Sequence, residues 1–140
     1  KTVYLLHHAS SDAGICRELK HRFEENENVV LLEQEFSCLE FNELVQKFDY
    51  LLASRFHSIV HAYKNGVPCV VLGWAKKYED LAARFGQQEY LLDVRSCVDG
   101  FALGAAMDCM NKNRDEESRR IRDHISAVQR ENVFDILGKE

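Results

Sequence analysis

The chain has 140 residues, which is close to the size of one domain. Hydrophobic residues make up 46% of it, enough for a core, and 23 acidic side chains against 18 basic ones give a formal net charge of −5. This balance excludes a bulk electrostatic attraction to nucleic acid or to an anionic membrane, but it leaves room for a local basic pocket. No apolar run approaches the roughly 20 residues of a membrane-spanning helix, so we expect no membrane span.

Short apolar runs alternate with helical patterns along the first two thirds of the chain. Short apolar runs, of which residues 2–6 are also β-branched, predict strands at residues 2–6, 29–32, 49–53, 68–72 and 90–94. Capping residues and apolar positions at helical spacing predict helices at residues 10–25, 37–48, 55–64 and 74–85. In the first of these helices, Ile15, Leu19 and Phe23 share one apolar face.

The order of these elements predicts the fold class. The strands are apolar throughout rather than alternating, which is typical of parallel strands covered on both faces. Strands that alternate with helices of about ten residues therefore predict an α/β fold, a doubly wound parallel five-stranded Rossmann-like sheet with right-handed crossovers.

A helical tail follows the last strand. A helix is expected to start at residues 96–99, and residues 101–110 are apolar nearly all round, which predicts a buried helix. Residues 112–123 are dense in both charges, as on a solvated helix face with i,i+4 pairs. The remaining apolar positions of the tail are Ile121, Ile125, Val128, Val133, Phe134, Ile136 and Leu137. We expect residues 1–140 to form a single Rossmann-like domain with tail helices at 97–138.

The cysteines bear on the compartment. There are five, an odd number without a Cys-x-x-Cys pair, which indicates reduced thiols. With no signal-peptide pattern visible, we expect a cytoplasmic protein. The sequence opens at Lys1 directly on a strand-like run, so we expect it to be a piece of a longer protein.

Basic and imidazole side chains gather where the predicted strands end. Open parallel sheets bind ligands beyond the carboxyl ends of their strands. The polar residues there, in chain order, are His7, His8, Glu33, Gln34, Glu35, Ser54, Arg55, His57, Trp74, Lys76 and Lys77. Six of them can be cationic, and they predict a local field suited to a small anion.

Arg55 and His57 fall in the first turn of a predicted helix, where backbone N–H groups and the helix dipole favour an anion. The Arg55 guanidinium matches a phosphate or carboxylate in bidentate fashion. His57 can transfer a proton near neutral pH, or it can be a structural imidazole. His57 and His61 have the i,i+4 spacing of metal ligands, but without an evident third ligand we expect no metal site and no cofactor.

Three short motifs follow one another: Ser54-Arg55-Phe56-His57, then Gly66-Val67-Pro68, then Gly73-Trp74-x-x-Lys77-Tyr78. In this order they resemble the C-terminal half of the polysaccharide pyruvyl transferase family, closely over residues 49–86 and more loosely over residues 1–95. The resemblance implies a fold like one lobe of the two-lobed glycosyltransferase-B architecture. It also implies transfer of the pyruvyl unit of phosphoenolpyruvate to a polysaccharide or glycan-precursor sugar as a ketal, with release of phosphate.

By the same resemblance, Arg55 and His57 would be the catalytic pair, with His57 as the acid and Arg55 on the leaving phosphate. The substrate-binding residues would be Ser54, Lys77, Lys76, Trp74, His7 and His8. The implied partners are phosphoenolpyruvate, a sugar or glycan acceptor, and an N-terminal lobe of the same protein outside these residues. We therefore expect the chain alone to bind the donor weakly and to show no turnover.

Two alternatives stay open. A nucleotide-sugar-binding lobe of a glycosyltransferase-B enzyme would use Arg55 and Lys77 on a diphosphate and Glu33 or Glu35 on a ribose. A non-catalytic interaction domain would instead use the apolar cluster at residues 133–137.

Overall fold

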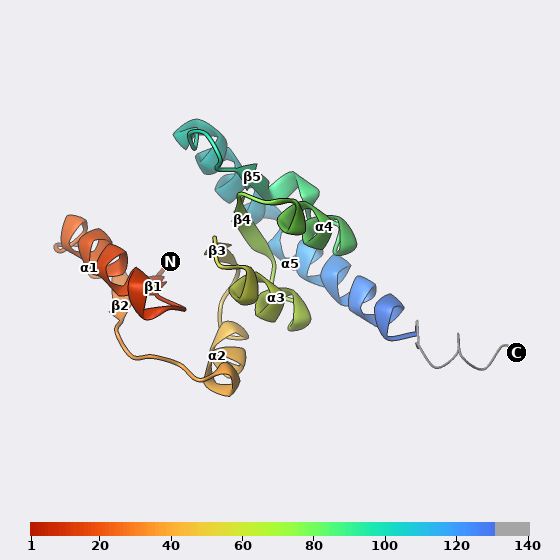
Figure 1. Cartoon of the computed structure of the whole chain (residues 1–140), viewed down its shortest axis with the longest axis horizontal. Coiled ribbons are helices and arrows are strands. Elements are labelled where there is room, and N and C mark those ends of the chain that lie inside the picture. Colours follow the sequence, from red (N-terminus) through yellow and green to blue (C-terminus); the bar gives the residue numbers. More distant parts are fainter. Residues whose placement is uncertain (131–140) are drawn as a thin grey trace, which may run out of the picture. The chain divides into compact units, whose positions relative to one another are not determined.

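The computed structural model describes residues 1–130 of the chain (Figure 1). Contacts between residues divide the chain into two compact units, Lys1–Phe41 and Asn42–Glu140, which we name unit 1 and unit 2. Each unit is built from parallel strands joined by helices, and each is described by itself.

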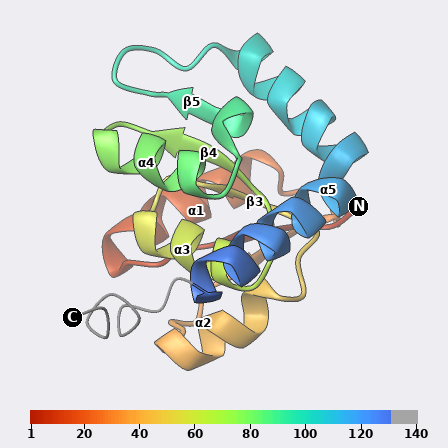
Figure 2. The ribbon, with the colours of Figure 1, turned by 90° about the vertical axis from the view of Figure 1, so that its right-hand side faces the viewer.

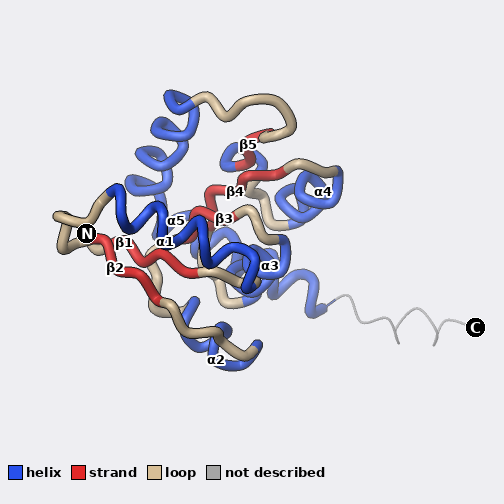
Figure 3. The backbone as a smooth tube through the Cα atoms, turned by 60° about the vertical axis from the view of Figure 1, so that its left-hand side comes forward, coloured by secondary structure: helices blue, strands red, loops and turns tan. Residues whose placement is uncertain are grey.

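Unit 1 is one strand-helix-strand crossover. Strand β1 (Val3–Leu6) leads through a 3₁₀ turn (η1, Ser10–Asp12) into helix α1 (Ala13–Arg22) and then into β2 (Val29–Leu32). The two strands pair in parallel, from Val3 opposite Val29 to Leu6 opposite Leu32, and α1 lies along them (Figure 3). Parallel strands need such a crossover because a tight turn cannot join them.

The apolar face of α1 is not the face that packs against the strands. Ile15, Leu19 and Phe23 are exposed, Ile15 by 62%. The side chain that α1 buries is Cys16, and Lys20, one turn further on, donates a hydrogen bond to the Val29 carbonyl oxygen at 2.7 Å. Positions four residues apart share a helix face, so the row through Cys16 faces the strands and the row through Ile15 does not.

The strands of unit 1 are also less covered than predicted. Val3 and Tyr4 of β1 are exposed, whereas Leu5 and Leu6 are half-buried. A two-stranded sheet with one helix beside it leaves part of its apolar surface open, so an apolar run did not imply cover on both faces.

Helix α2 (Cys38–Val45) begins with a capping box. The Glu40 backbone N–H donates to Ser37 Oγ at 3.3 Å, and the Ser37 N–H donates to Glu40 Oε2 at 2.9 Å. These two bonds satisfy N–H groups that a helix start leaves without a partner. Hydrogen bonding from the Ser37 side chain, and then from the Ser37 backbone N–H, lowers the pKa of the Glu40 carboxyl group.

Unit 2 holds a three-stranded parallel sheet. The strands β3 (Leu51–Ala53), β4 (Cys69–Gly73) and β5 (Leu91–Asp93) lie side by side in that order. The helices of this unit are α3 (Phe56–Lys64), α4 (Lys76–Arg84), a 3₁₀ turn η2 (Gln88–Tyr90) and α5 (Gly100–Arg130). The crossover helices α3 and α4 contact the strands that they join, as in a Rossmann-like fold.

Two layers of helix enclose this sheet. On one face Val70 of β4 packs in a core with Tyr90 and with Met110 of α5, which runs past the strands (Figure 2). Side chains alternate along a strand, so Gly73 belongs to the opposite face, where Tyr78 of α4 approaches it. The central strand β4 is therefore buried from both sides, as its apolar sequence predicted.

Over residues 100–130 the tail is one continuous helix, α5, rather than a buried segment followed by a solvated one. Phe101 is 85% exposed, so residues 101–110 are not buried all round, whereas Ile121 is fully buried inside the charged run. Glu117 is buried there as well and accepts a 2.6 Å hydrogen bond from Gln87 Nε2. Ser118 Oγ donates to the Gly66 carbonyl oxygen at 2.6 Å, which joins α5 to the end of α3.

The predicted single five-stranded sheet is wrong. Within the described residues, β1 pairs with β2 in one sheet, and β3, β4 and β5 form another. An apolar run predicts that a segment is a strand, but the choice of its neighbours depends on long-range contacts that the run does not encode. The fold is mixed α/β, with parallel strands in two small sheets. Among the described helices, none is both long enough and apolar enough to cross a bilayer.

Candidate anion-binding site at the strand ends of unit 2

The ends of β3 and β4 bring two of the predicted groups of residues to one edge of a sheet. The strands are parallel, with Leu51 opposite Cys69 and Ala53 opposite Val71. The segments that begin at Ser54 and at Trp74 therefore leave the sheet at the same edge. Ligands of open parallel sheets bind at this edge.

Tyr78 joins the two segments. Its hydroxyl donates a hydrogen bond to the Ser54 carbonyl oxygen at 2.9 Å, across from the first turn of α4 to the end of β3. Burial raises the pKa of the Tyr78 hydroxyl, while hydrogen bonding with Trp74 and the positive charge of Arg55 oppose that rise. The positive charge of Arg55 thus acts on the Tyr78 hydroxyl, which links the start of α4 to the end of β3.

An aromatic cluster, formed by Phe56, Trp74 and Tyr78, surrounds the Lys77 ammonium group. The Phe56 and Tyr78 ring centroids are 5.6 Å apart, nearly perpendicular, and those of Trp74 and Tyr78 are 5.8 Å apart. Lys77 Nζ lies 4.8 Å from the centroid of Phe56 and 5.5 Å from each of the other two. These distances are within the range of cation–π attraction.

Arg55 and His57 flank Phe56 at the start of α3. Arg55 is the N-cap residue, and the first helical hydrogen bond runs from the Ile59 N–H to the Arg55 carbonyl oxygen at 3.2 Å. The His57 ring meets the Phe56 ring edge-on, with 6.2 Å between centroids. Through Phe56, the segment that carries Arg55 and His57 is in contact with the segment that carries Lys77.

Lys76, the neighbour of Lys77, has different surroundings. Its ammonium group is exposed and lies 2.9 Å from Glu79 Oε2 and 3.4 Å from Asp80 Oδ1, both on α4. These carboxylates raise the pKa of Lys76 and balance its charge. The two adjacent lysines thus differ in what their charges face.

The remaining predicted site residues belong to unit 1. His7 follows β1 and is buried, with Nε2 at 3.3 Å from the Glu33 carbonyl oxygen at the end of β2. His8 is exposed, and its ring lies edge-on to Phe41 at 5.2 Å between centroids. Glu35 accepts a 2.9 Å hydrogen bond from Ser10 Oγ. These residues lie just after the ends of β1 and β2.

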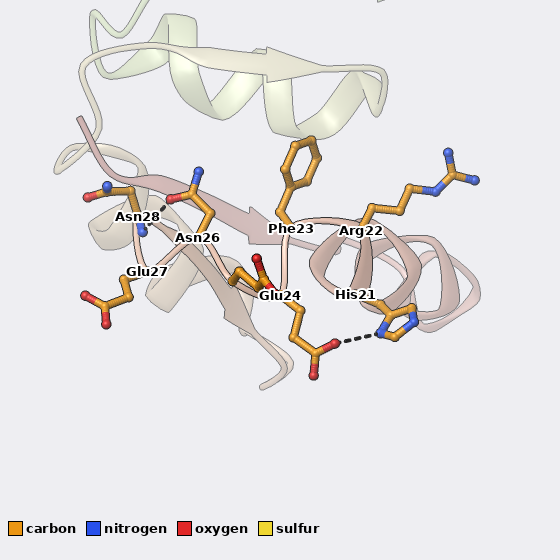
Figure 4. Close-up of a pocket in the computed structure, with 8 residues that line it drawn as sticks. His21, Arg22, Phe23, Glu24, Asn26, Glu27 and Asn28 are labelled. Carbon is orange, nitrogen blue, oxygen red and sulfur yellow. Dashed lines mark hydrogen bonds and ion pairs between the residues drawn. The ribbon is translucent and has the colours of Figure 1, made fainter.

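Unit 1 also has a shallow hollow at the turn between α1 and β2, lined by residues 21–28 (Figure 4). His21 Nδ1 lies 3.3 Å from Glu24 Oε2 within it, and Arg22 pairs with Glu18 of α1 at 2.7 Å. Three glutamates line it, so it is unsuited to an anion, and none of the predicted site residues reaches it.

Sequence reasoning missed two members of the edge in unit 2. Phe56 and Tyr78 stand in the sequence motifs, but neither was given a role of its own. The available signal was that both strand ends carry aromatic residues beside basic ones. Val133, Phe134, Ile136 and Leu137, the surface of the interaction-domain alternative, lie outside the described residues.

Comparison with known proteins gives one match. The model of a family described as polysaccharide pyruvyl transferase matches residues 1–76, slightly more than half of the 140 residues. The match covers Ser54, Arg55, His57 and Trp74, and ends one residue before Lys77. No curated protein and no solved structure matches the chain.

Proposed function

This chain belongs to the polysaccharide pyruvyl transferase family, and from that premise we propose that unit 2 binds the phosphoenolpyruvate donor of a pyruvyl transferase. The observation that carries the proposal is the junction of the Arg55 and Lys77 segments through Phe56, at the ligand-binding edge of a parallel sheet. Phosphoenolpyruvate carries a phosphate and a carboxylate on three carbons, so it needs more than one cation in a small space. We propose further that the chain acts as the donor-binding C-terminal lobe of a two-lobed transferase.

The reaction assigns a separate task to each residue. His57 donates a proton to the methylene carbon of the donor, and the neighbouring carbon becomes electron-poor. One sugar hydroxyl adds to that carbon, and a second displaces the phosphate, so two C–O bonds form and the C–O bond to phosphate breaks. Of the two hydroxyl protons released, one restores His57 and the other leaves with the phosphate.

Arg55 stabilises the negative charge that collects on the leaving phosphate, because its planar guanidinium offers two parallel N–H donors. Lys77 adds a point charge on phosphate or carboxylate. Ser54, Trp74, His7 and His8 stay predicted substrate contacts. For Lys76 we expect a small contribution, since Glu79 and Asp80 already face its charge.

The first test is binding of phosphoenolpyruvate to the chain by titration calorimetry. We expect weak binding to the wild type and a loss of roughly ten-fold or more in affinity for Arg55→Ala, the size of a charged hydrogen bond. Arg84→Ala, in the last turn of α4, is the matched control and should bind like the wild type.

Turnover is the second part of the test. In a protein with both lobes, His57→Ala should lower the rate of phosphate release with acceptor sugar by about 10²- to 10⁴-fold. Unchanged turnover in that variant would contradict the assignment of His57. Tight binding of a uridine or guanosine diphosphate, with no binding of phosphoenolpyruvate, would favour the nucleotide-sugar alternative.

A further inference from the structure

Lys76 and Lys77, at the start of α4, differ in how their side chains are ordered before a ligand binds. A lysine side chain has about 2 kcal/mol of rotamer entropy to lose when it is fixed on a ligand. A carboxylate partner could fix it beforehand, as Glu79 and Asp80 do for Lys76, but would also compensate its charge. A lysine that must bind an anion needs a partner that orders it without negative charge.

Aromatic rings provide such a partner, and Lys77 has three. Its ammonium group lies within 5.5 Å of the Phe56, Trp74 and Tyr78 centroids, nearest to Phe56 at 4.8 Å. The ring faces attract the cation through their quadrupoles and carry no net charge. An ammonium group has three N–H donors, so it can stay near the rings while it binds an anion.

Resting on the proposed function, we propose that the aromatic cluster positions Lys77 for the anionic donor, and that Phe56 is its principal positioning residue. Trp74 and Tyr78 lie close to Lys77 in sequence, so any start of α4 would keep them near. Phe56 comes from α3 and is the long-range member. It lies between Arg55 and His57, so one ring sets the distance between the Lys77 charge and the proposed catalytic pair.

The ring contact itself can be observed without any ligand. Ring currents shift protons above an aromatic face upfield, so the ε-methylene protons of Lys77 should resonate upfield of those of Lys76, which serves as the control in the same spectrum. Phe56→Leu should move the Lys77 resonances back downfield, and Phe56→Tyr should leave them in place. Equal positions for both lysines in the wild type would overturn the proposal.

The positioning role is tested by a double-mutant cycle on anion binding by the chain. Phe56→Leu keeps an apolar side chain of similar length but removes the ring, and should weaken phosphoenolpyruvate binding by about three- to thirty-fold, the range of a cation–π contact. Phe56→Tyr should restore binding. In the Lys77→Met background, Phe56→Leu should have no further effect, because Phe56 acts through Lys77.

The control for folding is Phe85→Leu. Phe85 is half-buried in the same unit and packs on Tyr63 at 5.0 Å between centroids, so it loses a comparable ring contact and should bind the donor like the wild type. Equal losses from Phe56→Leu with and without Lys77, or no loss at all, would overturn the positioning role while leaving the proposed function standing.

Failure of the proposed function gives a different result. If phosphoenolpyruvate does not bind but inorganic phosphate does, the donor assignment is lost, and the same cycle on phosphate decides the role of Phe56. If neither anion binds the wild-type chain, both proposals are overturned.

Discussion

The ends of β4 and β5 lie at the same edge of one sheet, and a basic side chain follows each, yet the two have opposite surroundings. After β5, Arg95 Nε donates to Asp93 Oδ2 at 2.9 Å and its backbone N–H donates to Asp93 Oδ1 at 3.0 Å. After β4, Lys77 faces three aromatic rings. The comparison teaches that position at a strand end does not make a basic residue available to an anion. The nearest partner of the basic side chain decides whether its charge can bind an anion.

The largest expected effect is a disruption of the β4 end. A Cβ atom added at Gly73 would lie 2.6 Å from Leu91 Cδ1 and 2.9 Å from Tyr78 Cβ. We expect Gly73→Ala to lower the free energy of unfolding by about 1–3 kcal/mol, as overpacking does, and to weaken donor binding because Tyr78 must shift. Urea denaturation and calorimetry measure the two effects.

Gly104→Ala is the matched control. A Cβ at Gly104 meets nothing within 4 Å, and the residue lies inside α5. The free energy of unfolding should therefore rise by about 0.5–1 kcal/mol, with donor binding unchanged. If Gly73→Ala proves as stable as Gly104→Ala, the close approach of α4 to β4 is contradicted.

A smaller effect is expected at the β5 end, where pH tests the strength of the Arg95 pair. Hydrogen bonds from the Arg95 side chain and backbone lower the pKa of Asp93 to about 2. Because this pKa is below that of the unfolded chain, near 4, the pair stabilises the fold fully above about pH 4 and loses its effect as the pH falls through about 2.

Arg95→Gln should return the Asp93 pKa toward its ordinary value, as measured by NMR titration of the carboxyl carbon. A wild-type Asp93 that already titrates near pH 4 would show that Arg95 is not held by it. The β5 end would then be a second available cation, and the contrast with β4 would be lost.

The smallest effect is expected for Lys76→Ala. Its charge is balanced by Glu79 and Asp80, and exposed pairs of this kind contribute little to stability. Donor affinity should change by less than about two-fold, in contrast to Lys77→Met. Equal losses from the two variants, compared by calorimetry, would break the distinction between a paired lysine and one held by rings.

Local features of the fold were predictable because they depend on near neighbours in sequence. Capping residues predicted a helix from residue 37, where Ser37 and Glu40 form a capping box, and the burial of strand β4 was confirmed as well. The exposure of the apolar face of α1 was not predictable, because Cys16 rather than Ile15 faces the strands. Which face of a helix is buried depends on the strands that pack against it, and those contacts join residues distant in the sequence.

The candidate site follows the same division. The motifs around Arg55, His57 and Lys77 were visible in the sequence, since they follow strands that apolar runs identify. The role of Phe56 was not visible in the sequence, because its position in the helix does not show which side chain it contacts. Its contact with Lys77 joins residues 21 positions apart, and only the pairing of β3 with β4 brings them together.

By itself, the sequence determined the alternation of strands and helices, the parallel crossovers and the motifs of the family, because these follow from short apolar runs, from the 3.6-residue period of helices and from short spacings. The tertiary structure decided that the strands form two sheets rather than one. It also decided that Phe56 meets Lys77, because these residues lie far apart in the chain and the pairing of β3 with β4 brings them together.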